Sequence, residues 1–217
     1  MIKLVAFDLD GTLADTLADL AGAMNYALRQ QNLPTYPVED YRRFVGNGID
    51  NLIRVTMARA FTPDGAKKAK SDFQSYYADH CKDHTAAYDG LTDLLQKLSE
   101  NGVKTAVISN KPNVFVPKIL EKLYPDHRFF IAWGQQQGVP RKPAPDALLK
   151  LVALSGYDKS EILYVGDSNV DVQFAHSAGI QVVGVSWGFR GAQELQEAGA
   201  DKIVNSAKEL YSLVNGE

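Results

Sequence analysis

Short apolar runs, rich in β-branched residues, recur along this chain with amphipathic segments between them. The runs predict strands over residues 3–7, 104–108, 129–133, 162–165, 182–185 and 203–204. One intervening segment carries the i, i+3, i+4, i+7 spacing of an amphipathic helix at Leu91, Leu94, Leu95 and Leu98. Strands that are apolar on both faces and alternate with helices indicate an α/β fold, here a Rossmann-like, doubly wound parallel sheet.

One stretch, residues 16–87, breaks this alternation because it carries helical periodicity and no convincing strand. A first apolar stripe consists of Leu17, Leu20, Ala21, Met24 and Leu28, and a second begins at Ile49. A third, more polar stripe covers residues 63–81, and the turn signal Tyr88-Asp89-Gly90 follows. We therefore expect an α-helical cap domain at 16–87, inserted into a discontinuous α/β core domain formed by 1–15 and 88–217.

Composition and charge narrow the class of protein. Of 217 residues, 45% are hydrophobic, which is enough apolar surface to form a core and excludes a disordered chain. The net charge of -3 argues against a nucleic-acid partner, which normally requires a basic excess. Cys81 is the single cysteine, so the chain has no disulfide framework, and its thiol fits a reducing cytoplasm. Neither a targeting signal nor a membrane-spanning stretch is apparent, so we expect a cytoplasmic protein without a membrane partner.

Two pairs of acidic residues follow predicted strands. Asp8 and Asp10 come directly after the first strand, and Asp167 and Asp171 follow the strand at 162–165. Any one of these residues could simply cap a helix, as Asp171 could for the helix that it begins. Asp8 and Asp10 together would repel each other unless a cation or a proton lies between them. If the two strands are neighbours, the carboxylates converge at one sheet edge, and such an oxygen-rich site suits Mg²⁺.

Positive and hydroxyl-bearing residues follow other turns. Ser109-Asn110-Lys111 comes after the second sheet strand, and Lys142 precedes Pro143 at a predicted helix start. A hydroxyl, backbone amides and an ammonium group can together hold a phosphate. Taken singly, Ser109 could be only a helix cap and each lysine only a surface group. A P-loop, a zinc-protease motif and a serine-hydrolase motif are all missing from the sequence, and the pair His80 and His84 fits a polar helix end better than a metal site.

In this order and at these strand ends, the motifs resemble those of the haloacid dehalogenase-like hydrolase superfamily. They are Asp8-Leu9-Asp10-Gly11-Thr12-Leu13, Ser109-Asn110-Lys111, Lys142-Pro143 and Gly166-Asp167-Ser168-Asn169-Val170-Asp171. The position of the helical insert resembles the helical-cap subclass. Within it, the chain is most similar to phosphoglycolate phosphatases in three segments: residues 16–20, 44–49 and 185–190.

The resemblance implies roles for the motif residues. Asp8 would be the nucleophile that forms an aspartyl-phosphate, and Asp10 the general acid and then the general base. Ser109, Asn110 and Lys142 would bind the phosphate. Mg²⁺ would be held by Asp8, by the backbone carbonyl of Asp10 and by Asp167, with Asp171 contacting these ligands from behind.

The resemblance also implies a small phosphorylated metabolite as the partner, with 2-phosphoglycolate as the preferred substrate. Substrate choice is expected in the cap, with Gly46, Asn47 and Arg54 as candidates, and Arg54 could equally be a surface residue. A pyrophosphatase, a nucleotidase or a phosphomutase of the β-phosphoglucomutase type stays an alternative. A dehalogenase is disfavoured by Asp10, and a non-catalytic phosphate-binding module by the complete acid set. Either a monomer or a homodimer is compatible with this sequence.

Overall fold

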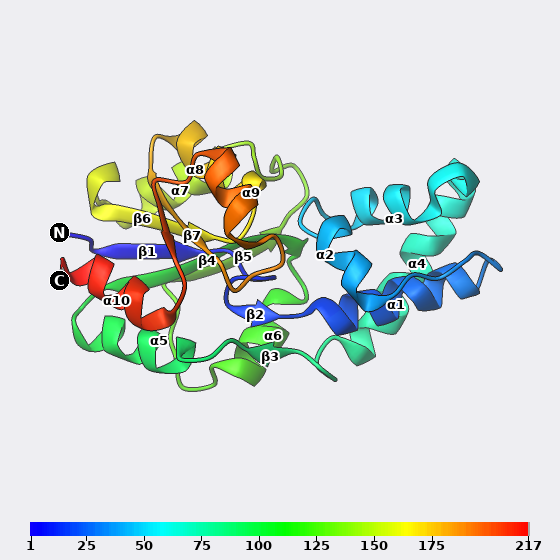
Figure 1. The fold of residues 1–217 in the computed structure, drawn as a ribbon, viewed down its shortest axis with the longest axis horizontal. Helices are drawn as coiled ribbons and strands as arrows, with labels where there is room; N and C mark the ends of the chain where they lie inside the picture. Colours follow the sequence, from blue (N-terminus) through cyan, green and yellow to red (C-terminus); the bar gives the residue numbers. More distant parts are fainter. Residues whose placement is uncertain (217) are drawn as a thin grey trace.

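The computed structural model describes residues 1–216, and within this range one parallel sheet organises most of the chain (Figure 1). Its order is β5-β4-β1-β6-β7-β8, so β1 lies centrally between β4 and β6. This architecture confirms the predicted α/β fold class. The strands are β1 (Leu4–Phe7), β4 (Lys104–Pro112), β5 (Ile131–Gln135), β6 (Ile162–Gly166), β7 (Gln181–Val185) and β8 (Lys202–Val204).

Strand β5 begins two residues later than the apolar run predicts. Phe129 belongs to that run, but its ring packs edge-on against Tyr124 and His127 instead of entering the sheet. The local pattern of apolar residues does not show these contacts between aromatic rings.

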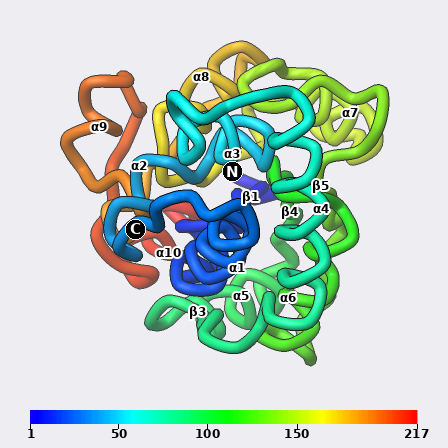
Figure 2. The backbone as a smooth tube through the Cα atoms, turned by 90° about the vertical axis from the view of Figure 1, so that its right-hand side faces the viewer, coloured from blue at the N-terminus to red at the C-terminus, as the bar shows by residue number. Residues whose placement is uncertain are grey.

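Helices cover both faces of the sheet because alternate strand residues point to opposite sides. In β1, Val5 and Phe7 enter one apolar cluster, whereas Leu4 and Ala6 enter the other. On the first face lie α5 (Leu91–Glu100), α6 (Val116–Leu123) and α10 (Ala207–Asn215). On the second lie α7 (Asp146–Ser155), α8 (Asn169–Ala178) and α9 (Gly191–Ala198), and Figure 2 shows the two groups on opposite sides.

A separate group of helices lies beyond the carboxyl ends of the strands, far from both chain termini (Figure 1). It contains α1 (Leu17–Arg29), α2 (Tyr41–Phe44), α3 (Ile49–Met57) and α4 (Pro63–His80), with short 3₁₀ helices at Val38–Asp40 and Ala58–Ala60. These helices share an apolar cluster of their own, in which α1 packs along α4. We refer to this group as the cap and to the sheet with its helices as the core.

The chain crosses between core and cap twice, and the crossings are paired with each other. Strand β2 (Ala14–Asp15) runs antiparallel to β3 (Ala86–Ala87), so entry and exit lie side by side. These short strands lie where the expected segments 1–15, 16–87 and 88–217 adjoin. Within residues 1–216, no helix has both the length and the apolar character required to cross a membrane.

Candidate active site

The strand order brings the motif residues together at the carboxyl ends of the strands. Because β1 lies between β4 and β6, Asp8 follows the central strand while Ser109 and Asp167 come from its two neighbours. The amide of Asp8 donates to the Val165 carbonyl at 2.9 Å, which extends the ladder by one residue beyond the strand. This placement agrees with the rule that ligands of open parallel sheets bind outside the carboxyl ends of the strands.

Three buried carboxylates converge at the carboxyl ends of these strands. Asp8, Asp167 and Asp171 each offer an oxygen, and these oxygens lie within 4.8 Å of one another. Burial raises the pKa of Asp8 to about 7, and the charges of Asp171 and Asp10 add to this effect while Lys142 opposes it. Burial likewise raises the pKa of Asp167 well above its usual range, reinforced by Asp171 and Asp8. The cluster thus carries more buried negative charge than its surroundings neutralise, and an oxygen-only donor set of this kind fits a hard divalent cation.

Asp167 is held by close backbone approach. Its Oδ2 accepts a hydrogen bond of 2.7 Å from the amide of Phe189, and its Oδ1 a longer one of 3.4 Å from Thr12 Oγ1. A Cβ at Gly188 would lie 2.2 Å from the Cβ of Asp167, and one at Gly11 would lie 2.3 Å from its Oδ2. Both positions therefore need glycine, because any side chain would displace this carboxylate.

The buried ammonium of Lys142 balances part of this negative charge. Its Nζ lies 3.0 Å from Asp8 Oδ1 and 2.7 Å from Asp171 Oδ1, and it donates to the Tyr164 hydroxyl at 3.0 Å. Burial lowers the pKa of Lys142, but the two facing carboxylates raise it by more, so the net shift is upward. The ammonium is therefore charged at neutral pH and fixed beside Asp8.

Asp171 performs both functions that its position allowed. As a helix-end residue, it accepts hydrogen bonds from the Ser168 amide at 3.2 Å and the Ser168 hydroxyl at 2.7 Å, which forms a capping box at the start of α8. Its other oxygen faces Lys142 and Tyr164. The capping-box hydrogen bonds at the start of α8 therefore fix the carboxylate that positions Lys142.

The side chain of Asp10 turns away from the three-carboxylate cluster. Its Oδ1 accepts from Thr16 Oγ1 at 2.6 Å and from Lys111 Nζ at 2.9 Å. Lys111 is buried, and its Nζ lies 4.7 Å from the ring centroid of Tyr77 in α4. Lys111 belongs to the predicted motif, but its pairing with Asp10 and Tyr77 could not be deduced from the sequence.

Ser109 and Asn110 are buried within β4, which continues to Pro112, so they belong to the strand and do not follow it as the sequence predicts. The Asn110 side chain donates to the carbonyl oxygens of Gly46 and Lys142, both at 3.1 Å, and accepts from the Lys142 amide at 2.9 Å. Ser109 Oγ accepts from the Lys111 amide at 3.3 Å. The end of β4 is thus joined both to the Lys142 segment and to the cap.

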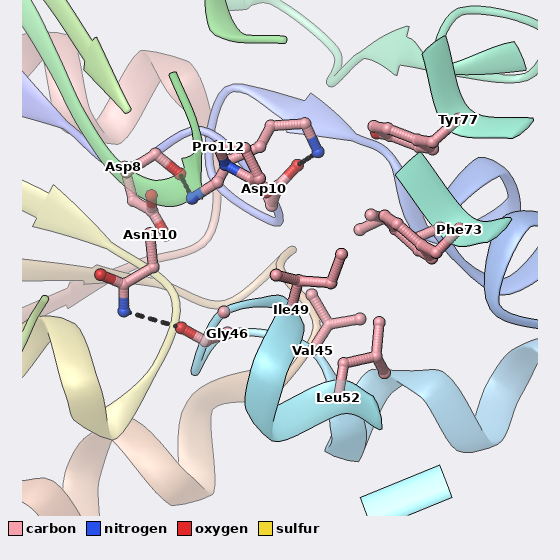
Figure 3. A pocket seen from close by; sticks show the side chains of 14 residues that line it. Asp8, Asp10, Val45, Gly46, Ile49, Leu52, Phe73, Tyr77, Asn110 and Pro112 are labelled. Carbon is pink, nitrogen blue, oxygen red and sulfur yellow. Dashed lines mark hydrogen bonds and ion pairs between the residues drawn. The ribbon is translucent and has the colours of Figure 1, made fainter. Parts of the chain in front are cut away.

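A pocket lies between core and cap (Figure 3). The core contributes Asp8, Asp10, Ser109, Asn110, Lys111 and Pro112. The cap contributes mainly apolar groups: Leu20, Val45, Gly46, Gly48, Ile49, Leu52, Phe73 and Tyr77. The pocket therefore has one charged wall and one apolar wall.

The candidate specificity residues of the cap separate in the structure. Gly46 lines the pocket, whereas the side chain of Asn47 is exposed and that of Arg54 donates to Asn51 on the exposed face of α3. Phe73 and Tyr77, which line the pocket, are not among the sequence-based candidates. Their spacing of four residues, continued back to buried Ala69, is the signal that marks them on an otherwise polar helix.

Three core side chains hold the cap segment 45–50. Asn110 donates to Gly46, Arg190 donates to the Val45 carbonyl at 2.8 Å, and Arg141 pairs with Asp50. Asp50 also pairs with Lys70 of α4 at 2.6 Å. The cap in this structure is therefore closed onto the core by contacts from β4 and from two loops.

Comparison with known proteins places this site in a family. The model of the family described as haloacid dehalogenase-like hydrolase matches residues 5–185, which is most of the chain. The chain belongs to the haloacid dehalogenase-like hydrolase family. The resemblance inferred from the four motifs is thereby confirmed.

Individual relatives of this haloacid dehalogenase-like hydrolase cover nearly its whole length. A phosphoglycolate phosphatase of Mannheimia succiniciproducens is 34% identical over 219 residues, covering 98% of both chains. One from Haemophilus influenzae (strain 86-028NP) is 32% identical with the same coverage. The crystal structure of a proposed phosphoglycolate phosphatase from Lactobacillus delbrueckii subsp. bulgaricus gives a TM-score of 0.94 at 36% identity, covering 99% of each chain. The chain is accordingly an enzyme, a phosphoric monoester hydrolase of this family.

Proposed function

We propose that this hydrolase dephosphorylates 2-phosphoglycolate to glycolate and phosphate, in a Mg²⁺-dependent reaction through an aspartyl-phosphate on Asp8. The observation that carries the proposal is the convergence of buried Asp8, Asp167 and Lys142 beneath a pocket that the cap closes. The phosphoglycolate phosphatases that cover the chain almost completely support the choice of substrate.

Asp8 is suited to nucleophilic attack on phosphorus because its second oxygen is free of the hydrogen bonds that hold Oδ1. That atom, Oδ1, accepts from the Leu9 amide at 2.7 Å and faces Lys142 at 3.0 Å. The attack splits one difficult displacement into formation and hydrolysis of a covalent intermediate. Lys142, Ser109 and the amide of Asn110 would neutralise the charge on the transferred phosphoryl group.

Asp10 would protonate the leaving oxygen and then deprotonate the attacking water. Two observations support this role: the carboxyl group lines the pocket, and Thr16 and Lys111 fix its orientation. Asp10 would contact the metal through its backbone carbonyl only. Its side chain, which the hydrogen bonds from Thr16 and Lys111 turn away from the carboxylate cluster, is not required as a metal ligand.

The residues present fit Mg²⁺. Asp8 and Asp167 would hold the ion together with the backbone carbonyl of Asp10, while Asp171 contacts Lys142 behind them. When bound, the ion neutralises the repulsion between an anionic nucleophile and an anionic phosphate. The uncompensated buried carboxylates are the structural reason to expect an ion here, and their oxygen-only chemistry favours Mg²⁺ over softer metals.

The test is phosphate release from a panel containing 2-phosphoglycolate, pyrophosphate, nucleoside monophosphates and sugar phosphates, with and without Mg²⁺. We expect the highest kcat/KM for 2-phosphoglycolate and loss of turnover on chelation. A higher kcat/KM for another compound of the panel would contradict the assignment of 2-phosphoglycolate as substrate. Isomerisation of a hexose phosphate with little phosphate release would identify a phosphomutase.

The nucleophile is tested separately. Asp8→Asn should abolish hydrolysis of p-nitrophenyl phosphate, whereas Asp72→Asn, which changes a half-buried acid of the cap outside the pocket, should not. Turnover that survives in Asp8→Asn would refute the covalent mechanism. The cytoplasmic location and the monomeric or homodimeric state stay predictions of the sequence.

A further inference from the structure

Two hydrogen-bond donors of the pocket are left without sufficient acceptors. Among residues 1–216, the hydroxyl of Tyr77 is the buried side-chain polar atom that lacks any partner, although the residue is only 1% exposed. The ammonium of Lys111 has three N–H groups but meets a single acceptor within these residues, Asp10 Oδ1. Buried donors are normally satisfied, so unpaired ones in a cavity indicate a missing ligand.

These two donors face the same space. Lys111 Nζ lies 4.7 Å from the centroid of the Tyr77 ring, and both residues line the pocket between core and cap. Figure 3 shows the Tyr77 hydroxyl on the side of the ring that faces Asp10, the residue that would protonate the leaving group. Burial raises the pKa of the Tyr77 phenol well above its ordinary value, so the hydroxyl keeps its proton. Both groups therefore offer hydrogen bonds toward the position of the leaving group.

The remainder of the cap wall is apolar. Leu20, Val45, Ile49, Leu52 and Phe73 offer no polar side-chain atom. The nearby arginines are engaged elsewhere, Arg141 with Asp50 and Arg190 with the Val45 carbonyl. An anionic leaving group that enters this pocket thus finds side-chain donors at Tyr77 on the cap wall and at Lys111 on the facing core wall.

We propose that Tyr77 and Lys111 form a carboxylate-binding subsite that holds the leaving-group end of the substrate. The phenol and the ammonium each donate to a carboxylate oxygen, while the apolar wall excludes longer or more polar leaving groups. The inference rests on the proposed function and deepens it, since it names the residues that distinguish a short phosphorylated carboxylic acid from other phosphomonoesters. A hydrogen bond to a charged group is strong enough for such discrimination.

The test compares 2-phosphoglycolate with ethyl phosphate, which has the same two carbons but no carboxylate. The measured quantity is the ratio of kcat/KM for the two esters. Tyr77→Phe should lower this ratio about 10-fold or more, because it removes one donor and keeps the ring. The matched control is Tyr76→Phe, the same change one residue earlier, where the ring stacks on Tyr26 and lies outside the pocket, and the ratio should stay at the wild-type value.

The outcomes separate this inference from the proposed function. If wild type prefers 2-phosphoglycolate and Tyr77→Phe keeps the full preference, the proposed function stands and the role of Tyr77 is refuted. If wild type shows no preference, or hydrolyses neither ester, both the substrate and the subsite are refuted.

Thermal melting of both tyrosine variants controls for folding. If Tyr77→Phe does not fold, inhibition of the wild-type enzyme provides the test. Glycolate should inhibit ethyl phosphate hydrolysis competitively and more strongly than ethanol. Equal inhibition by the two compounds would refute the subsite.

Discussion

The two walls of the pocket differ in how their buried polar groups are paired. On the core side, buried charged groups face one another, as Lys142 faces Asp8, Asp171 and the Tyr164 hydroxyl, and the excess negative charge of the three carboxylates is suited to a cation. On the cap wall, the buried Tyr77 hydroxyl has no hydrogen-bond partner within residues 1–216, and most of the neighbouring side chains are aliphatic or aromatic. The core wall is therefore prepared for the phosphate and the metal before any ligand arrives, whereas the cap wall is completed by the leaving group.

The difference between the walls has a physical cause. Asp8, Ser109 and Asp167 stand at the carboxyl ends of neighbouring strands that are hydrogen-bonded along the sheet, so their positions are determined by the fold. The cap residues come from separate helices held together by apolar packing, which fixes shape but imposes no charge pattern. A family can keep its chemistry on the first surface and vary its substrate on the second.

The largest expected effect concerns the charge balance of the core wall. Lys142→Met should lower the free energy of unfolding by about 3–5 kcal/mol, because it leaves the carboxylates of Asp8 and Asp171 buried without a cation. Urea denaturation at neutral pH without divalent metal measures it. Lys3→Met, which removes a solvent-exposed pair with Glu161, is the control and should change stability far less. Equal losses in both variants would contradict a special role for the core charges.

Metal binding should sharpen the same contrast. Mg²⁺ at roughly 100 times its dissociation constant should stabilise the protein by about 2.7 kcal/mol, since it binds the folded carboxylate cluster and not the unfolded chain. Thermal melting with increasing Mg²⁺ measures the shift. Asp167→Asn should abolish the shift, and Asp72→Asn should retain it. A shift that persists in Asp167→Asn would place the ion elsewhere.

Two buried tyrosines test the difference between the walls directly. Tyr164→Phe removes a hydroxyl that contacts Lys142, Asp171 and the Ile108 carbonyl, so stability should fall by roughly 1–3 kcal/mol. Tyr77→Phe removes a hydroxyl without a partner, so the ligand-free protein should gain roughly 1 kcal/mol. Urea denaturation of the two variants should give changes of opposite sign. Destabilisation by both would mean that the cap wall is satisfied as the core wall is.

The smallest effect concerns how the walls are held together. Asp50→Asn weakens the pair between the cap and Arg141, and should raise KM by roughly 2- to 5-fold because exposed pairs are worth less than about 1 kcal/mol. Steady-state kinetics at low and high salt should show the difference from wild type shrinking as salt rises. Asp72→Asn removes a pair with Lys68 inside α4 and should leave KM unchanged. A salt-independent effect would argue against an electrostatic contact.

Much of the core wall could be predicted from sequence because its signals are local. Asp8 and Asp167 each follow a short apolar run, and a strand that ends at a known residue places its next side chain at the sheet edge. The carboxylate cluster still required the strand order, since only adjacency of β1 and β6 brings these residues together.

The cap wall could be predicted much less well. Of the candidates Gly46, Asn47 and Arg54, Gly46 lines the pocket and the other two side chains are exposed. Phe73 and Tyr77, which also line it, are not among the candidates. Helix periodicity identifies the buried face of α4 but cannot say whether that face meets the other cap helices or the cavity. Strands β2 and β3 contain two residues each, too few for an alternating pattern to be recognised.

By itself, the sequence determined the alternating α/β core, the helical insertion and the identity of the acids and lysines available for chemistry. These depend on neighbouring residues, whose periodicity and motifs are visible along the chain. Only the tertiary structure decided which carboxylates share a site, that Lys111 pairs with Asp10, and that the Tyr77 hydroxyl lacks a partner. Each of these depends on contacts between segments distant in the sequence, and whether a buried donor is satisfied follows from the packed arrangement of several elements at once.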